Sequence, residues 1–114
     1  MADQLKVTRV AIAPPIRIIQ DAREAAETLE RLVGRSNPRL VSDLAIAAGF
    51  VALAAEAAEW NVKVNLDSIN ALSPEDDPAD EDARRSRDSV GRTREICDRI
   101  VDACRTDPTR TIVD

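Results

Sequence analysis

The residues best suited to chemistry in this chain stand immediately before its most apolar segment. Ser42 and Asp43 are followed at Leu44 by a long run of alanine and larger apolar residues. Burying an ionised carboxylate costs on the order of several kcal/mol unless it is paired or hydrogen-bonded, so an aspartate at this point indicates a role. The alternative is that Ser42 or Asp43 serves only as a helix N-cap, with Asn37-Pro38 in the preceding loop.

A second polar group lies beyond the apolar segment. Asn61 and Asn65 are four residues apart, so on a continuous helix both side chains point the same way. Neutral amides can hold a heterocycle through paired donor and acceptor contacts, and Trp60 beside them could stack on a planar ligand. The alternative is that the asparagines cap a helix end and that Trp60 is a core or interface residue.

The elements that position these groups are predicted to be helices. Residues 16–33 carry apolar side chains at steps of three and four, with Pro14-Pro15 suited to the helix start and Gly34 to its end. The next helix is predicted to begin at Asn37 as N-cap, with Pro38 at its first position. Residues 44–58 are apolar or small on all sides with Glu56 as the sole charge, which predicts a central helix surrounded by others.

The remaining segments are less regular. Residues 61–66 alternate like a short strand, but they follow a helix without Gly or Pro, so we interpret them as its bending end. The acidic stretch 73–82 is a solvated linker or the lead-in to a final helix, which runs from about Ala79 or Asp82 to Cys104 with one narrow apolar stripe. Residues 1–13 fit a helix or a strand.

These elements predict an all-α fold, a small antiparallel helical bundle with a central Ala-rich helix. We expect one domain over residues 1–114, with an acidic linker at 72–82. The first and last helices each offer a single apolar stripe, so the central helix is incompletely covered. Completion of the bundle by self-association is the natural remedy.

Composition excludes several functions. Sixteen basic against 21 acidic residues give a net charge of −5, which opposes binding to nucleic acid or to an anionic membrane. The absence of His and Tyr excludes a Ser-His-Asp triad and a His-ligated metal, and no metal site is expected. Cys97 and Cys104 would lie about 10 Å apart on a helix, which is too far for a disulfide. With no predicted signal peptide or membrane-spanning run, we expect a cytoplasmic protein.

Four segments together resemble a known family. Pro14-Pro15-Ile16, Ser36-Asn37-Pro38, the run from Ser42-Asp43 to Ala48, and Asn61-Val62-Lys63-Val64-Asn65-Leu66 are similar to the latter half of the formiminotetrahydrofolate cyclodeaminase and methenyltetrahydrofolate cyclohydrolase family. The resemblance covers about residues 14–69 without gaps. It implies an all-helical, dimer-based assembly acting on a one-carbon unit of tetrahydrofolate, which is the substrate, with no further cofactor.

The resemblance also assigns roles to residues. Asp43 matches the family's aspartate and would transfer protons, while Ser42, Asn37, Asn61 and Asn65 match polar positions that would orient the pterin or the attacking water. Family members open with a glycine-rich loop of the Pro-Gly-Gly-Gly-Ser kind, whereas Gly34, Gly49 and Gly91 stand alone here. Three readings follow: a short hydrolase or lyase completed across a homodimer or larger homo-oligomer, a subunit completed by a second chain that supplies the Gly-rich half, or a non-catalytic interaction subunit or degenerate member.

Overall fold

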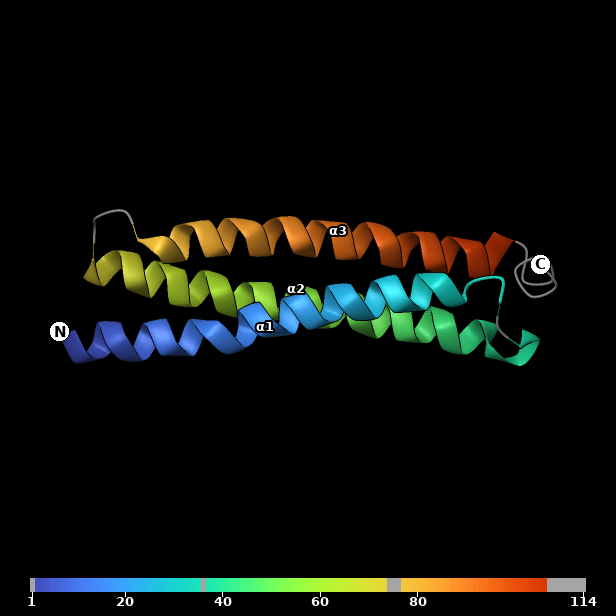
Figure 1. The fold of residues 1–114 in the computed structure, drawn as a ribbon, viewed down its shortest axis with the longest axis horizontal. Coiled ribbons are helices and arrows are strands. Elements are labelled where there is room, and N and C mark those ends of the chain that lie inside the picture. The colour runs from blue at the N-terminus through green and yellow to red at the C-terminus, as the bar shows by residue number, and fades with distance from the viewer. Residues whose placement is uncertain (1, 36, 74–76, 107–114) are drawn as a thin grey trace.

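The chain forms a bundle of three long helices in a computed structural model that describes residues 2–35, 37–73 and 77–106. α1 spans Ala2–Leu32, α2 spans Val41–Leu72 and α3 spans Pro78–Thr106, with a short 3₁₀ turn, η1, at Pro38–Leu40. Successive helices run in opposite directions and lie side by side, giving a rod of 59 × 18 × 16 Å (Figure 1). The predicted all-α antiparallel bundle is confirmed.

α1 is longer than its sequence predicts. Pro14 and Pro15 were expected at the helix start, but both lie inside a helix of 31 residues, so residues 2–13 are helical as well. Each proline removes one backbone donor from the helical ladder. Ile12 and Ile19, two turns apart on one face, are both buried in the core, and their packing holds the helix together across the prolines.

The connection between α1 and α2 follows local rules. Gly34 has a φ of 78°, the left-handed conformation that favours glycine after a helix, as its position predicts. Asn37 accepts two hydrogen bonds at the start of η1: its side-chain oxygen from the Arg39 N–H at 3.0 Å and its carbonyl from the Leu40 N–H at 2.8 Å. Asn37 thus caps the 3₁₀ turn, and the α-helix itself begins four residues later than Asn37.

α2 is one continuous helix of 32 residues, so residues 61–66 are helical as interpreted, but the helix does not end there and continues to Leu72. Its inner face contacts α1 and α3, and the buried residues on it are Leu44, Ala48, Ala55, Ala58, Val62 and Ile69. The opposite face is exposed, so α2 is not surrounded on all sides within one chain, and the predicted incomplete cover of the central helix is confirmed. Within one chain, α1 and α3 cover only one side of α2.

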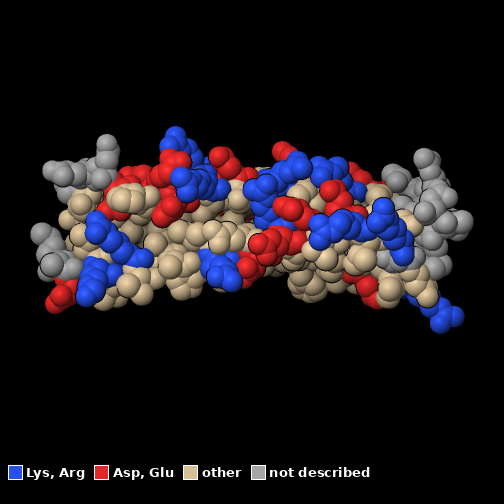
Figure 2. Space-filling view, viewed as in Figure 1, with Lys and Arg blue, Asp and Glu red and all other residues tan. Residues whose placement is uncertain are grey.

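Among the described residues, α2 is the one helix that is long and apolar enough to cross a membrane by length and composition. No such helix was expected from the sequence. Core helices of helical bundles satisfy the same criterion. Charged side chains crowd the upper edge of Figure 2, where α3 lies, whereas uncharged residues dominate the middle of this view.

α3 begins at Pro78, so residues 78–82 of the predicted linker form its first turns. Of the rest of that linker, residues 74–76 lie outside the described part of the chain. The predicted apolar stripe faces inward, with Val90, Cys97, Ile100 and Cys104 buried. Both cysteines are free and buried, as expected, and burial raises the pKa of each thiol.

Candidate functional site

Asp43 lies in the first turn of α2, next to the 3₁₀ turn that precedes the helix. Its side chain is exposed in the single chain, as is that of Ser42, because Leu44 takes the inward position of this turn. Burial of Asp43 was expected from the sequence and is not observed within one chain. A carboxylate in the first turn is nevertheless well placed, because the helix N-terminus favours negative charge.

Asn61 and Asn65 lie on the second half of α2 and share one side of the helix, as predicted. The amide nitrogen of Asn65 donates to the backbone carbonyl of Asn61 at 2.9 Å. Trp60 is 68% exposed and borders a cleft of about 220 Å³ between α2 and α3. In this cleft the Arg94 Nε donates a hydrogen bond to the Glu56 Oε1 at 2.7 Å. This bond raises the pKa of the Arg94 guanidinium.

The two polar groups are far apart within one chain. Asp43 and Asn61 are separated by 18 residues of the same helix, which is five full turns, or about 27 Å along the axis. They lie on the same side of α2, but a single folate-sized ligand placed at Asp43 would not reach Asn61. The structure therefore brings Asn61 together with Asn65, and Ser42 and Asn37 close to Asp43 along the chain, as two separate groups.

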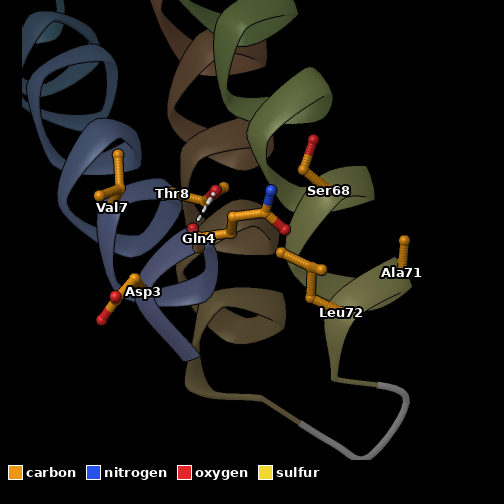
Figure 3. A pocket seen from close by; sticks show the side chains of 7 residues that line it. All are labelled: Asp3, Gln4, Val7, Thr8, Ser68, Ala71 and Leu72. Carbon is orange, nitrogen blue, oxygen red and sulfur yellow. Dashed lines mark hydrogen bonds between the residues drawn. The ribbon is translucent and has the colours of Figure 1, made fainter. Parts of the chain in front are cut away.

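A larger groove lies at the other end of the rod. It has a volume of about 600 Å³ and is lined by the start of α1 and the end of α2 (Figure 3). Gln4 and Thr8 extend into it from α1, and the Thr8 hydroxyl donates to the Gln4 carbonyl at 2.8 Å. The groove contains none of the five predicted site residues. Within the described residues, no group of three or more His, Cys, Asp or Glu is arranged to hold a metal ion.

Asp77 is a buried polar residue whose place the sequence analysis missed. Its carboxylate accepts a hydrogen bond from the Ala79 N–H at 2.9 Å and forms an ion pair with Arg9 of α1. The bond from Ala79, followed by that from Arg9, lowers the pKa of Asp77. The signal was present in the sequence, because Asp77-Pro78 followed by Asp80 is typical of a capped helix start.

The outer face of α2 carries a continuous apolar surface, which we call the outer stripe. Its five large members are 56–68% exposed. The whole set follows alternating steps of four and three residues: Ile46, Phe50, Leu53, Ala57, Trp60 and Val64. Such spacing is that of a helix face that packs against another helix. Asp43 and Asn61 lie along one edge of this stripe.

The comparisons with known proteins agree with the resemblance seen in the sequence. A family model described as formiminotransferase-cyclodeaminase matches residues 2–84. The chain belongs to this family. No curated protein and no solved structure gives a significant match.

The matched region of this cyclodeaminase-family chain contains α1, α2 and the first turns of α3. All five predicted site residues therefore fall inside it, as does the whole outer stripe. The rest of α3 lies beyond the matched region and contributes Ile96, Cys97 and Ile100 to the core. Family membership thus bears on the helix that carries Asp43, while α3 completes the fold around it.

Proposed function

We propose that this protein acts on a one-carbon unit carried by tetrahydrofolate. It either hydrolyses methenyltetrahydrofolate or closes formiminotetrahydrofolate with release of ammonia, and Asp43 transfers the proton. Ser42 and Asn37 lie close to Asp43 along the chain, and they bind the pterin or the attacking water together with Asn61 and Asn65 of another copy of the chain, because these asparagines lie about 27 Å or more from Asp43 within one chain. The observation that carries this proposal is the family match over residues 2–84, which includes the exposed carboxylate at the start of α2.

The hydrolysis needs one group that can accept and return a proton. Water attacks the methenyl carbon while the Asp43 carboxylate takes one of its protons. The bond from that carbon to one ring nitrogen then breaks, and the nitrogen receives the proton held by Asp43. The second proton of the water is lost to solvent, and the product carries a formyl group on the other nitrogen.

The cyclisation uses the same group in a related way. A nitrogen of the folate attacks the formimino carbon, the bond from this carbon to the terminal nitrogen breaks, and ammonia leaves. The formimino group reacts in its protonated form, so its terminal nitrogen already carries two protons. Asp43 accepts the proton of the attacking nitrogen and passes it to this terminal nitrogen, which leaves as ammonia while the positive charge stays on the methenyl bridge. Both reactions therefore depend on a carboxylate that is accessible to the substrate, and Asp43 is exposed.

The test is the decay of methenyltetrahydrofolate, followed through the near-ultraviolet absorbance of its methenyl bridge. The purified protein should accelerate this decay over buffer, and Asp43→Asn should reduce the acceleration by about a hundredfold or more, as is typical for a lost general acid or base. Asp21→Asn is the matched control, because Asp21 is an exposed carboxylate on α1 paired with Arg17 at 3.2 Å. Equal rates for the wild type and Asp43→Asn would reject the assignment.

A second candidate function is a non-catalytic helical interaction subunit. The outer stripe favours it, because α2 presents large apolar side chains to solvent over much of its length. The measurement is the mass in solution, alone and mixed with the product of an adjacent reading frame. A complex that forms without any effect on folate turnover would support this function over the enzymatic one.

A further inference from the structure

The seam between α1 and α2 continues from the groove of Figure 3 toward the two asparagines. The α2 wall of the groove includes Ser68 and Leu72. Asn61 and Asn65 stand seven residues before these two, which is close to two full turns, so they lie on nearly the same side of α2 about 10 Å farther along the axis. The asparagines therefore line the next stretch of the same seam.

The α1 wall of the seam changes character over the same distance. In the groove it includes Val7 and Thr8, and seven residues later it consists of Pro14 and Pro15. Because the two helices run antiparallel (Figure 1), two turns forward along α1 match two turns back along α2. Pro14 and Pro15 are therefore level with Asn61.

The two prolines alter what the backbone of α1 offers at this level. A proline has no N–H, so the carbonyls of Val10 and Ala11 lack the donor that an α-helix supplies four residues on. Ala11 and Pro14 are exposed, and Val10 is 67% exposed, so these carbonyls are accessible to a ligand. Two consecutive backbone acceptors thus lie open beside the seam.

The asparagine amides stand across the seam from these carbonyls. The amide nitrogen of Asn65 is already engaged, since it donates to the Asn61 carbonyl at 2.9 Å. The side chain of Asn61 is exposed and, within the part of the chain that the structure describes, makes no hydrogen bond of its own. Its amide can therefore donate to a ligand and accept from it.

We propose that the two carbonyls freed by Pro14-Pro15 bind the amino-pyrimidone edge of the pterin, and that the Asn61 amide binds the neighbouring ring oxygen. The inference rests on the proposed function, which names the folate. It adds backbone atoms of α1 to a site for which the sequence predicts side chains alone.

The ring edge and the protein atoms match in kind and in order. A pterin carries an exocyclic amino group and an adjacent ring N–H, both of which donate, followed by a carbonyl oxygen that accepts. The carbonyls of Val10 and Ala11 accept from the first two groups, and the amide of Asn61 donates to the third. All of these protein groups are uncharged, which suits an uncharged ring.

Guanine has the same edge, but the surroundings favour the pterin of a folate. The seam leads from the asparagines into the groove of about 600 Å³, whose walls include Val7 and Leu72. The groove lies about 10 Å along the axis from Asn61, a distance that the aminobenzoyl group of a folate reaches and the ribose of a guanosine does not.

Restoring the missing N–H tests the inference. Pro14→Ala supplies a donor to the Val10 carbonyl, so it should weaken the binding of tetrahydrofolate by roughly three- to tenfold, as is typical for one lost hydrogen bond. The same change should raise the midpoint of thermal unfolding, because alanine favours a helix interior far more than proline does. Isothermal titration calorimetry on the full chain measures the affinity, and tetrahydrofolate has no one-carbon unit that could react.

Pro14→Gly is the matched control. It supplies the same N–H with a smaller gain in helix stability, so it should weaken binding as much as Pro14→Ala does. A loss of affinity that follows the unfolding midpoint instead of the restored N–H would overturn the inference.

The carbonyl carbon resonances in NMR give a direct readout. Those of Val10 and Ala11 are observed through the N–H groups of Ala11 and Ile12, and both should move downfield on saturation with tetrahydrofolate, since each carbonyl then accepts a hydrogen bond. The carbonyl of Ile18 keeps its helical donor and should not move.

The outcomes separate this inference from the proposed function. Wild-type affinity in Pro14→Ala, or unmoved resonances of Val10 and Ala11 in a protein that hydrolyses methenyltetrahydrofolate, would overturn the inference alone. Binding of guanosine without binding of tetrahydrofolate would overturn both the pterin as ligand and the proposed function. Binding of neither compound would also overturn both.

Discussion

The two faces of α2 differ in the size of their apolar residues. In an ordinary monomer the largest apolar residues lie on the inner face, whereas in α2 they lie on the outer face. On the inner face, which contacts α1 and α3, half of the buried residues are alanines: Ala48, Ala55 and Ala58. The outer face carries the chain's only Phe and only Trp, Phe50 and Trp60, each 68% exposed. Small residues inside let the three helices approach closely. Large residues outside indicate that α2 has a second packing partner.

This contrast bears on how the site is built. Asp43 and the two asparagines lie along the edge of the outer face, so whatever packs on that face also decides what surrounds them. The inner face, by contrast, contributes to stability and carries none of the predicted site residues. The same helix thus serves the fold with one side and the proposed function with the other.

The largest expected effect comes from truncating the inner face. Ile69 is fully buried, so Ile69→Ala removes packed methylene groups and should lower the free energy of unfolding by about 2–5 kcal/mol. Ile46→Ala is the matched control, with the same change on the same helix at a residue that is 56% exposed. Urea unfolding of dilute protein, where the chain is monomeric, should show a loss below about 1 kcal/mol for the control.

Equal losses for the two variants would mean that the faces do not differ in packing. At high protein concentration the control should behave differently, because Ile46→Ala removes an apolar side chain from the exposed face through which self-association is expected. The midpoint of its unfolding should then rise less steeply with concentration than that of the wild type. Ile69→Ala should keep the wild-type dependence on concentration.

The sequence predicts where the helices lie better than it predicts which face of each helix is buried. Apolar spacing located the amphipathic part of α1 and of α3, and Gly34 marked the turn after α1 correctly. Asn37 caps the 3₁₀ turn, whereas α2 begins four residues later than predicted. The continuation of α1 through Pro14 and Pro15 could not be predicted, because the local rule for proline opposes it and only the burial of Ile12 and Ile19 overrides that rule. Distant packing, absent from any short window of sequence, decides this case.

The candidate site shows the same limit. α2 is apolar all round, so its pattern contains no contrast from which to tell the inner face from the outer one. The exposure of Asp43 depends on this choice of face, and its burial was therefore mispredicted. The spacing of Asn61 and Asn65 needed only a continuous helix, and for that reason their common side was predicted correctly.

A smaller effect is expected at Asp77, which lies at the start of α3 and bonds to α1 rather than to the outer face. Its pKa is lowered mainly by the bond from the Ala79 N–H, so its contribution to stability is present above the ordinary pKa of an aspartate and is lost as the pH falls through the lowered value. Thermal unfolding should show Asp77→Asn a few degrees less stable at neutral pH. The difference should shrink as the pH falls below the ordinary pKa of an aspartate.

Asp88→Asn on the exposed side of α3 is the control for this titration. It should follow the wild-type curve over the same range. If Asp77→Asn and the wild type keep a constant difference down to the lowest pH, the cap and the ion pair with Arg9 do not contribute through the charge of Asp77.

The smallest expected effect is the change in stability when a methyl group is added to the exposed side of α2. Gly49 lies on the exposed side of α2 near the outer stripe, and a Cβ added there meets no atom within 4 Å in the single chain. Gly49→Ala should therefore stabilise the dilute monomer by about 0.5–1 kcal/mol, because alanine favours the helix and nothing must move. Gly91→Ala on α3 has the same open surroundings and should give a similar gain at every protein concentration. At concentrations where the protein self-associates, the gain from Gly49→Ala should fall below that from Gly91→Ala, because Gly49 lies on the face through which self-association is expected. Equal gains at every concentration would mean that the outer face of α2 packs against no other molecule.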